Sequence, residues 1–273
     1  MRSLNKTFLL GIGEAKCGTT WLHEYCKKAP NYVSPNVKEW NIWTEYFSYG
    51  KAATSYNDET KKIRHSMLNT PEFYEEYFTK ILSDPKHTIT SDISPSYSCL
   101  STQNHQHLKQ RLDRYFNLKV VYLFRDPVLT AWSAYKHDIR TKKGNYFAEP
   151  DIKEFVQGYD NQLFMSCNYV NVIRQIKSVY KEQLLVMPYE RLFAPNSNNG
   201  LIELSNFLGI EPMKEEKNIM HNVGQPGDLP DWAKREAWNL LMKDPKVAGS
   251  YSLIRRDYPD VYEQWMKGIV KKL

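Results

Sequence analysis

The feature that most constrains the fold is a glycine-rich turn between a short apolar segment and an amphipathic one. Residues 7–12, Thr-Phe-Leu-Leu-Gly-Ile, are typical of a buried β-strand. Gly11, Gly13 and Gly18 fall within eight residues, and a helix is expected from about Thr19 to Lys28. Glycines in such a turn let backbone N–H groups converge on an anion at the helix N-terminus. The segment therefore predicts a phosphate-binding loop.

This loop differs from the Walker A loop of nucleoside triphosphatases. The spacing from Gly13 to Gly18 fits that pattern, but the next residue is Thr19, where a triphosphatase has lysine. The lysine of this loop is Lys16, inside the turn. This chain therefore lacks the lysine that a kinase or ATPase needs at that position of the loop. The remaining alternative is an ordinary strand-to-helix turn with a solvated lysine.

A second strand end carries residues suited to an anion. Residues 119–124, Lys-Val-Val-Tyr-Leu-Phe, form the clearest strand pattern in the chain and lead into Arg125. Arginine offers phosphate a charge-assisted fork of donors, and the hydroxyl of Ser133 in the next helix adds another. We expect Asp126 to be the N-cap of the helix that Pro127 opens. A Walker B strand with this aspartate on magnesium is the rival interpretation, which the adjacent arginine and proline disfavour.

Short apolar runs alternate with amphipathic stretches along the rest of the chain, which is typical of α/β proteins. We predict one domain over residues 1–273, with a P-loop-like three-layer α/β fold in which helices flank a central parallel sheet. Ligands are then expected at the carboxyl ends of the strands. The further predicted strands are Thr88–Ile93 and Leu184–Met187; the further predicted helices are His107–Phe116, residues 161–182, Leu201–Leu208 and the segment from Asp231.

The pattern Gly-x-x-Lys-x-Gly-Thr-Thr-Trp-Leu of residues 13–22 resembles the 5′-phosphosulfate loop of the sulfotransferases that use 3′-phosphoadenosine 5′-phosphosulfate (PAPS). In that family the loop amides and the threonine pair hold the 5′-phosphate, and the lysine contacts the oxygen between phosphorus and sulfur. The family's 3′-phosphate motif has the form of Arg125 and Ser133. The resemblance thus implies one catalytic cation or general acid, Lys16. It implies a cofactor-binding set: Lys16, Cys17, Gly18, Thr19, Thr20, Trp21, Arg125 and Ser133.

The resemblance also implies a general base. In the carbohydrate branch of the family, which includes heparan sulfotransferases, a Lys-Glu or similar pair follows the loop by about the distance of Lys38 and Glu39 here. We assign the base to Glu39, with Lys38 as an auxiliary; Asp92, ahead of a Ser-Pro-x-Tyr motif, is the alternative. Heparan enzymes often carry lysine at the position of Ile93. The Lys-Thr-His-type motif of the small-molecule branch does not occur in this chain.

Four other segments carry weaker signals. Residues 189–192, Tyr-Glu-Arg-Leu, resemble a family element that we interpret as mainly structural. Residues 221–227 lie where relatives place a basic loop over the nucleotide. Residues 140–144 are either a contact for an anionic acceptor or a solvated basic loop. Four aromatic residues either line an acceptor cleft or belong to the core: Trp40, Trp43, Tyr46 and Phe47.

Composition limits the partners only weakly. The 273 residues include 37 Lys and Arg against 31 Asp and Glu, a formal charge of +6, which suits any anionic partner. The four cysteines lack metal-ligand spacing and are expected to be reduced thiols. No apolar run approaches the ~20 residues of a membrane span and no cleavable leader is recognised, so a cytoplasmic protein without a membrane span is expected.

Together these features predict an enzyme, a PAPS-dependent sulfotransferase whose nucleotide product is 3′-phosphoadenosine 5′-phosphate (PAP). We expect in-line transfer of a sulfuryl group to a hydroxyl or amine, with a carboxylate base and no metal. The expected acceptor is a saccharide or another hydroxyl compound, and not nucleic acid. The alternatives are a P-loop kinase or NTPase, and a basic nucleic-acid-binding protein whose affinity falls steeply with salt.

Overall fold

A four-stranded parallel sheet runs through the middle of the molecule. The computed structural model describes residues 5–50, 56–70, 72–142, 149–158, 168–193, 197–212 and 229–269. The strand order is β2-β1-β3-β4, and each neighbouring pair is parallel. The strands are β1 (Thr7–Gly11), β2 (Ile89–Ile93), β3 (Asn117–Phe124) and β4 (Leu184–Pro188). The predicted α/β class with a central parallel sheet is therefore confirmed.

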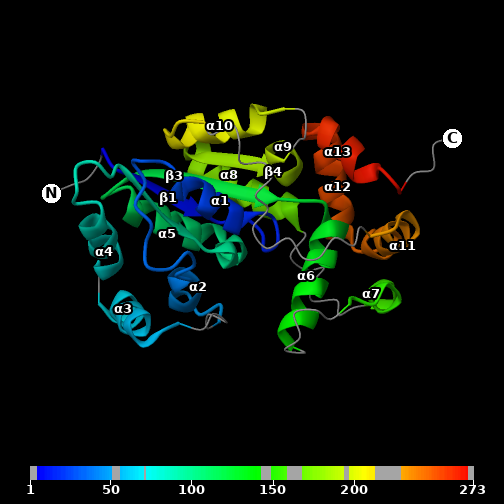
Figure 1. The fold of residues 1–273 in the computed structure, drawn as a ribbon, viewed down its shortest axis with the longest axis horizontal. Coiled ribbons are helices and arrows are strands. Elements are labelled where there is room, and N and C mark those ends of the chain that lie inside the picture. The colour runs from blue at the N-terminus through cyan, green and yellow to red at the C-terminus, as the bar shows by residue number, and fades with distance from the viewer. Residues whose placement is uncertain are drawn as a thin grey trace.

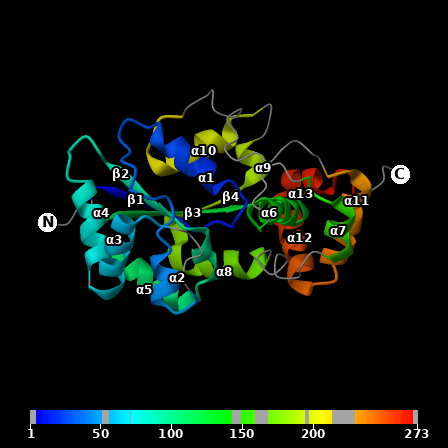
Figure 2. The ribbon, with the colours of Figure 1, turned by 60° about the horizontal axis from the view of Figure 1, so that its bottom comes forward.

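Helices cover both faces of this sheet (Figures 1 and 2). Because side chains alternate along a strand, each strand contributes to two separate cores. One face buries Leu9 and Val121 under α1 (Thr19–Lys27), α9 (Tyr189–Leu192) and α10 (Asn199–Leu208). The other face buries a larger, aromatic-rich core that includes Phe8 and Tyr122. Its helices include α4 (Phe73–Ile81), α5 (Thr102–Leu112) and α8 (Tyr169–Tyr180).

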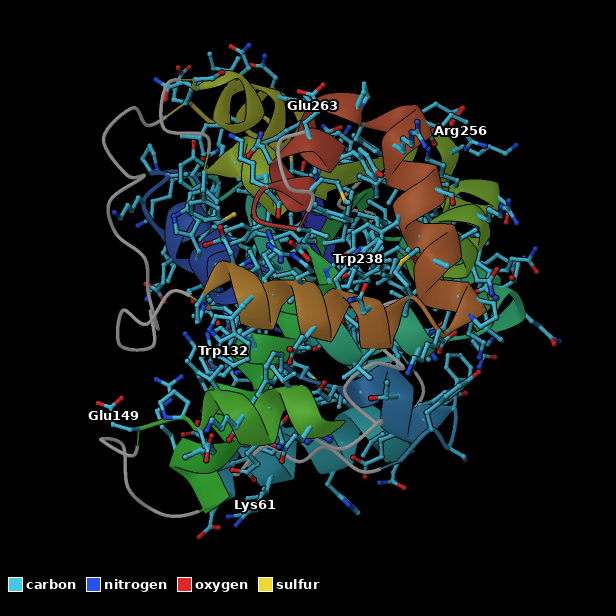
Figure 3. All side chains as sticks on the ribbon, turned by 90° about the vertical axis from the view of Figure 1, so that its right-hand side faces the viewer. Lys61, Trp132, Glu149, Trp238, Arg256 and Glu263 are labelled. Carbon is cyan, nitrogen blue, oxygen red and sulfur yellow. The ribbon has the colours of Figure 1, made fainter. Side chains whose placement is uncertain are left out.

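A group of helices lies beside the carboxyl ends of the strands, on the right of Figures 1 and 2. Aromatic contacts hold it together: the rings of Trp238 and Tyr251 are 6.2 Å apart, and those of Tyr251 and Trp265 are 5.4 Å apart. In Figure 3, Trp238 lies among these helices, whereas Arg256 and Glu263 lie at the rim. The group comprises α6 (Pro127–Lys142), α7 (Ile152–Gly158), α11 (Asp231–Leu241), α12 (Pro245–Asp257) and α13 (Pro259–Met266).

Helix α5 corrects one sequence prediction. It begins at Thr102, five residues before the predicted His107, and ends at Leu112 rather than Phe116. The side chain of Ser101 accepts the N–H of Asn104 at 3.2 Å and so caps the helix earlier than the apolar pattern suggested. The predicted helix over 161–182 is α8 in its described part, since residues 159–167 lie outside the described residues.

Sequence analysis missed several short elements. These are α2 (Ile42–Tyr46), α3 (Asp58–Asn69), α4, α7 and the 3₁₀ turns Pro95–Cys99 and Lys181–Gln183. Within the described part of the chain, no helix combines the length and the apolar character needed to cross a membrane.

Two helical glycines give a matched test of the packing. A Cβ on Gly200 in α10 would lie 2.4 Å from the carbonyl oxygen of Arg191, whereas a Cβ on Gly249 in α12 would meet only Val170 Cγ2 at 3.6 Å. We expect Gly200→Ala to lower the free energy of unfolding by about 1–3 kcal/mol through overpacking. Gly249→Ala should be neutral or stabilising by up to ~1 kcal/mol. Urea denaturation of both variants checks this, and equal midpoints would contradict the packing of α9 on α10.

Candidate functional site

The glycine-rich turn lies directly against strand β3. The backbone N–H of Glu14 donates to the carbonyl of Leu123 at 2.9 Å. A Cβ on Gly13 would lie 2.5 Å from the nitrogen of Leu123, and one on Gly11 would lie 2.6 Å from the side chain of Ile93. The first two glycines are therefore required by the neighbouring strands rather than by an anion. Ile93 itself is 0% exposed and belongs to the core.

The third glycine shapes the start of α1. Gly18 has a φ of +92°, Lys16 has a φ of +66°, and no side chain caps the helix. Intrahelical bonding begins with Leu22 N to Gly18 O, at 2.9 Å. The N–H groups of Thr19, Thr20 and Trp21 precede this bond, and the first N–H groups of a helix have no partner within it. This end of α1 therefore has the geometry and dipole of an anion site.

Two of the predicted loop residues have buried side chains. Cys17 is 0% exposed, and its Sγ lies 3.7 Å from Thr130 Oγ1 of α6. Trp21 is 4% exposed and its ring stacks on Tyr25 at 4.8 Å. Their side chains thus pack the loop against α6 and the rest of α1, so a ligand would meet their backbone amides.

The Lys38–Glu39 pair lies beside this loop. Lys38 Nζ is 3.3 Å from Thr19 Oγ1, 3.3 Å from Thr20 Oγ1 and 2.5 Å from Glu39 Oε1. The lysine side chain is 15% exposed and the glutamate 33%. The hydroxyl of Tyr56 donates to the carbonyl of Glu39 at 2.9 Å. The carboxylate expected to be the base is therefore partly open and is linked to the anion loop through one ammonium group.

Asp92, the alternative base, is buried behind this pair. It accepts hydrogen bonds from Ser94 Oγ (2.6 Å), Tyr97 OH (2.7 Å), Tyr74 OH (2.8 Å) and Trp40 N (3.3 Å). Both of its oxygens are engaged and it is 0% exposed. Burial raises the pKa of this carboxyl, and the four donors oppose that shift. Asp92 thus anchors the residue that follows Glu39 instead of facing an acceptor.

Lys16 lies in a strongly charged environment. Its burial lowers the pKa of its ammonium to about 8; the charge of Arg140 acts in the same direction, and those of Asp138 and Glu39 oppose it. These charges come from α6 and from the segment after α1. The loop, α6 and the Glu39 segment therefore converge on one place.

Arg125 leaves the carboxyl end of β3 and lies over an aromatic ring. Its guanidinium carbon is 4.3 Å from the ring centroid of Tyr189, at the start of α9. The hydroxyl of Tyr169 donates to its carbonyl at 2.7 Å. Its Nε is buried and has no hydrogen-bond partner among the described residues. A buried donor without a partner is costly, so this atom is suited to a ligand oxygen.

Ser133 lies on the face of α6 that meets the glycine-rich loop. Thr130 on that face contacts Cys17. Burial lowers the pKa of His137, and the charge of Lys16 acts in the same direction. Ser133 is three residues after Thr130 and four before His137, so the three share one helix face. Ser133 therefore lies on the same side as the anion loop.

The predicted cap at Asp126 is confirmed. Its Oδ1 accepts the N–H of Val128 at 2.9 Å, and its Oδ2 lies 3.3 Å from Lys234 Nζ of α11. Because Asp126 is 0% exposed and already paired, the Walker B role for it is wrong. Among the described residues, no group of three or more His, Cys, Asp and Glu side chains could hold a metal ion.

The aromatic residues after Glu39 divide between core and surface. Trp40 is 0% exposed and Trp43 is 1% exposed, so both belong to the core. Tyr46, in contrast, is 43% exposed. Arg140 is described and acts on Lys16, but residues 143–148 and 213–228 lie outside the described residues. The turn-rich segment 221–227, at the position where relatives have a basic loop, therefore has no structural account.

Sequence analysis missed the part played by two residues. Tyr189 was interpreted as structural, yet it contacts Arg125, and its ring lies 3.3 Å from the position of a Cβ on Gly18. Glu14 lies within the loop, is 4% exposed and accepts from Tyr122 OH at 3.0 Å. Burial raises the pKa of Glu14 to about 8. An acid inside a loop expected to receive an anion was the signal that could have drawn attention to it.

Fold and site together define an α/β protein with a glycine-rich loop and a helix N-terminus at the carboxyl edge of a parallel sheet. A family model described as "Sulfotransferase domain" matches residues 6–223, most of the chain, so the chain belongs to the sulfotransferase family. It is accordingly an enzyme of the PAPS-dependent sulfotransferase class. No curated protein sequence matches it.

Solved structures support the same fold. A sulfotransferase from Alicyclobacillus acidocaldarius is 20% identical, with a TM-score of 0.59 over 94% of this chain and 98% of that one. The sulfotransferase domain from the curacin biosynthetic pathway is 16% identical, with a TM-score of 0.50 over 100% of both chains. The sulfotransferase domain from the Synechococcus PCC 7002 olefin synthase is 16% identical, with a TM-score of 0.50 over 100% of this chain and 97% of that one.

The buried Glu14 makes stability depend on pH. Because the pKa of its folded state, about 8, exceeds the ordinary value of 4.5, its contribution is fully present below the ordinary pKa and is lost as the pH rises through 8. Glu14→Gln should therefore gain stability relative to the unsubstituted protein, by roughly 4 kcal/mol between pH 5 and pH 9. Urea denaturation at several pH values measures this. Glu76→Gln, at an exposed position of α4, is the control, and a pH-independent difference for Glu14→Gln would contradict the shift.

Proposed function

We propose that this chain transfers the sulfuryl group of PAPS to a hydroxyl or amine acceptor, with Glu39 as the general base. The observation that carries the proposal is the position of Lys38, within 3.3 Å of the hydroxyls of Thr19 and Thr20 and 2.5 Å from Glu39 Oε1. A carboxylate one side chain away from an anion loop supports deprotonation of an acceptor next to the donor's 5′ end.

For the donor, we propose two separate anion sites. At the 5′ end, the amides of residues 18–21, the hydroxyls of Thr19 and Thr20 and the ammonium of Lys16 would hold the phosphosulfate. At the 3′ end, Arg125 and Ser133 would hold the 3′-phosphate. Among the described residues, the Nε of Arg125 has no hydrogen-bond partner and no side chain caps the start of α1. Both observations support this assignment, because each leaves donors for ligand oxygens.

When bound, PAPS supplies an activated sulfuryl group and a phosphate leaving group. Glu39 would take the acceptor's proton, since its side chain is partly exposed and needs no counter-ion beyond Lys38. Lys16 would balance charge on the leaving phosphate. With a pKa of about 8, it is mainly protonated at neutral pH yet is a stronger acid than an ordinary lysine. The transferred group carries less charge than a phosphoryl group, so the proposal includes no metal.

For the acceptor, we propose a saccharide or similar hydroxyl compound. The proposal rests on the resemblance of the Lys38–Glu39 segment to the carbohydrate branch. Tyr46, which is 43% exposed and follows that segment, is an aromatic face available to a sugar ring. Turnover of labelled PAPS with saccharides, lipids, phenols and tyrosine peptides identifies the acceptor, and activity on phenols alone would contradict the saccharide.

We further propose that residues 1–273 act as a single sulfotransferase domain. The matched family segment ends at residue 223, but α11, α12 and α13 contact α6, α8 and α9. Lys234 of α11 pairs with Asp126 at the start of α6. These contacts support one common core, and one cooperative unfolding transition is expected.

Nucleotide binding tests the donor sites. We expect PAP to raise the midpoint of thermal unfolding, and ATP with magnesium to give little or no increase. Lys16→Ala and Arg125→Ala should each weaken PAP binding at least tenfold in calorimetry, because each removes a cation from one phosphate site. Lys27→Ala, on the exposed side of α1, is the matched control. Stabilisation by ATP with magnesium but not by PAP would refute the proposal.

Turnover tests the base. Glu39→Gln keeps the size of the side chain but cannot take a proton, so kcat should fall roughly 10²–10⁴-fold while PAP affinity stays within about threefold. Glu59→Gln, at an exposed position of α3, should leave both unchanged. Labelled PAPS and the acceptor found in the screen provide the measurement. If Glu39→Gln retains turnover, a residue other than Glu39 must be the general base.

A further inference from the structure

A buried cluster of charges surrounds the backbone of Arg125 and Asp126. Asp126 is 0% exposed, and its carboxylate is contacted by Lys234 Nζ (3.3 Å), Tyr251 OH (3.2 Å) and Val128 N (2.9 Å). Two of these groups come from α11 and α12, which follow the segment matched by the family model. The C-terminal helices thus reach the residue next to the proposed 3′-phosphate ligand.

A second acidic side chain lies beside Asp126. Glu190 Oε1 accepts the backbone N–H of Asp126 at 3.2 Å. Burial raises the pKa of Glu190 to about 7, and the charge of Asp126 acts in the same direction. Two acidic side chains therefore lie against the backbone that carries Arg125.

Lys234 is the cation that compensates Asp126. Burial raises the pKa of Asp126, and the charge of Lys234 is the largest influence that lowers it. The lysine side chain is only 11% exposed, and its Nζ also donates to the carbonyl of Lys267 at 3.1 Å. Arg125 instead lies over the ring of Tyr189, with its Nε unpaired among the described residues.

From this arrangement we infer that Lys234 is a positioning residue for the 3′-phosphate: it neutralises Asp126 and thereby leaves the guanidinium of Arg125 available to a ligand. Without Lys234, the buried carboxylate of Asp126 would lack its counter-ion, and its negative charge would compete with a 3′-phosphate for the cation of the adjacent residue, Arg125. The site would then prefer a nucleotide with a 3′-phosphate less strongly over one without it. This inference rests on the proposed role of Arg125.

The experiment compares PAP with 5′-AMP, which has the same adenosine and 5′-phosphate but no 3′-phosphate. Lys234→Met should weaken PAP binding about tenfold or more in calorimetry and change AMP binding less than threefold. Lys234→Arg should keep the ratio of the two affinities near that of the unsubstituted protein. Lys243→Met, at an exposed position after α11, is the matched control. If Lys234 had only a structural role, Lys234→Met would weaken the binding of PAP and of AMP alike. That outcome, or no change in either affinity, would overturn the inference.

A second substitution keeps the test independent of folding. Asp126→Asn retains an oxygen for the N–H of Val128 and removes the charge that Lys234 compensates. The double variant Asp126→Asn/Lys234→Met should restore the PAP-to-AMP ratio to within about threefold. If the double variant instead has the same PAP-to-AMP affinity ratio as Lys234→Met alone, the inference is overturned. Should Lys234→Met not fold, Asp126→Asn alone is compared with the double variant: both should keep the preference for PAP, and a tenfold loss in either contradicts neutralisation.

Arg125→Ala distinguishes failure of the proposed 3′-phosphate site from failure of the inferred role of Lys234. If it weakens PAP binding selectively while Lys234→Met has no effect, the proposed 3′-phosphate site stands and only the role of Lys234 fails. If Arg125→Ala affects PAP and AMP equally, the assignment of Arg125 fails, and the inference fails with it.

Discussion

A buried carboxylate must be hydrogen-bonded or paired, and two aspartates near the carboxyl ends of strands β2 and β3 show what this constraint does for the site. Asp92, in β2, receives four donors, one of which is the N–H of Trp40. Asp126, after β3, receives a helix N–H, a tyrosine and Lys234. Each aspartate fixes the backbone next to a side chain that we propose to be functional: Glu39 in the first case and Arg125 in the second. Rigid sheet ends thus position groups that are themselves partly open.

The anion loop depends on a different constraint, which is close approach of backbone to backbone. Gly13 lies so near β3 that no side chain fits, and this contact fixes the direction in which the loop leaves the sheet. The loop then reaches α6 through Cys17, and Lys38 connects its threonines to Glu39. The glycine-rich loop, proposed to hold the donor, and the carboxylate are therefore parts of one hydrogen-bonded unit, and the charge on either is expected to affect the other.

The fold was largely accessible from local patterns. Strands of apolar residues and the cap at Asp126 follow from short-range rules, and each lies within a few residues of its predicted place. The misses have physical causes. Helix α2 lies in a segment rich in aromatic residues, where Trp40 and Trp43 gave no clean helical period because both face the core. Helix α5 starts earlier than predicted because a serine cap, and not the apolar pattern, sets its first residue.

The sequence by itself determined the α/β class and supplied the proposed anion loop with the candidates Lys16, Glu39, Arg125 and Ser133, because these belong to short local motifs. It did not determine which candidates have a free side chain. Only the tertiary structure removed Asp92 from contention as base, brought Tyr189 beneath Arg125, and joined Lys234 to Asp126. The contacts of Tyr189 and Lys234 join residues far apart in the chain, and they arise only when parallel strands align their carboxyl ends and the helices pack around that edge.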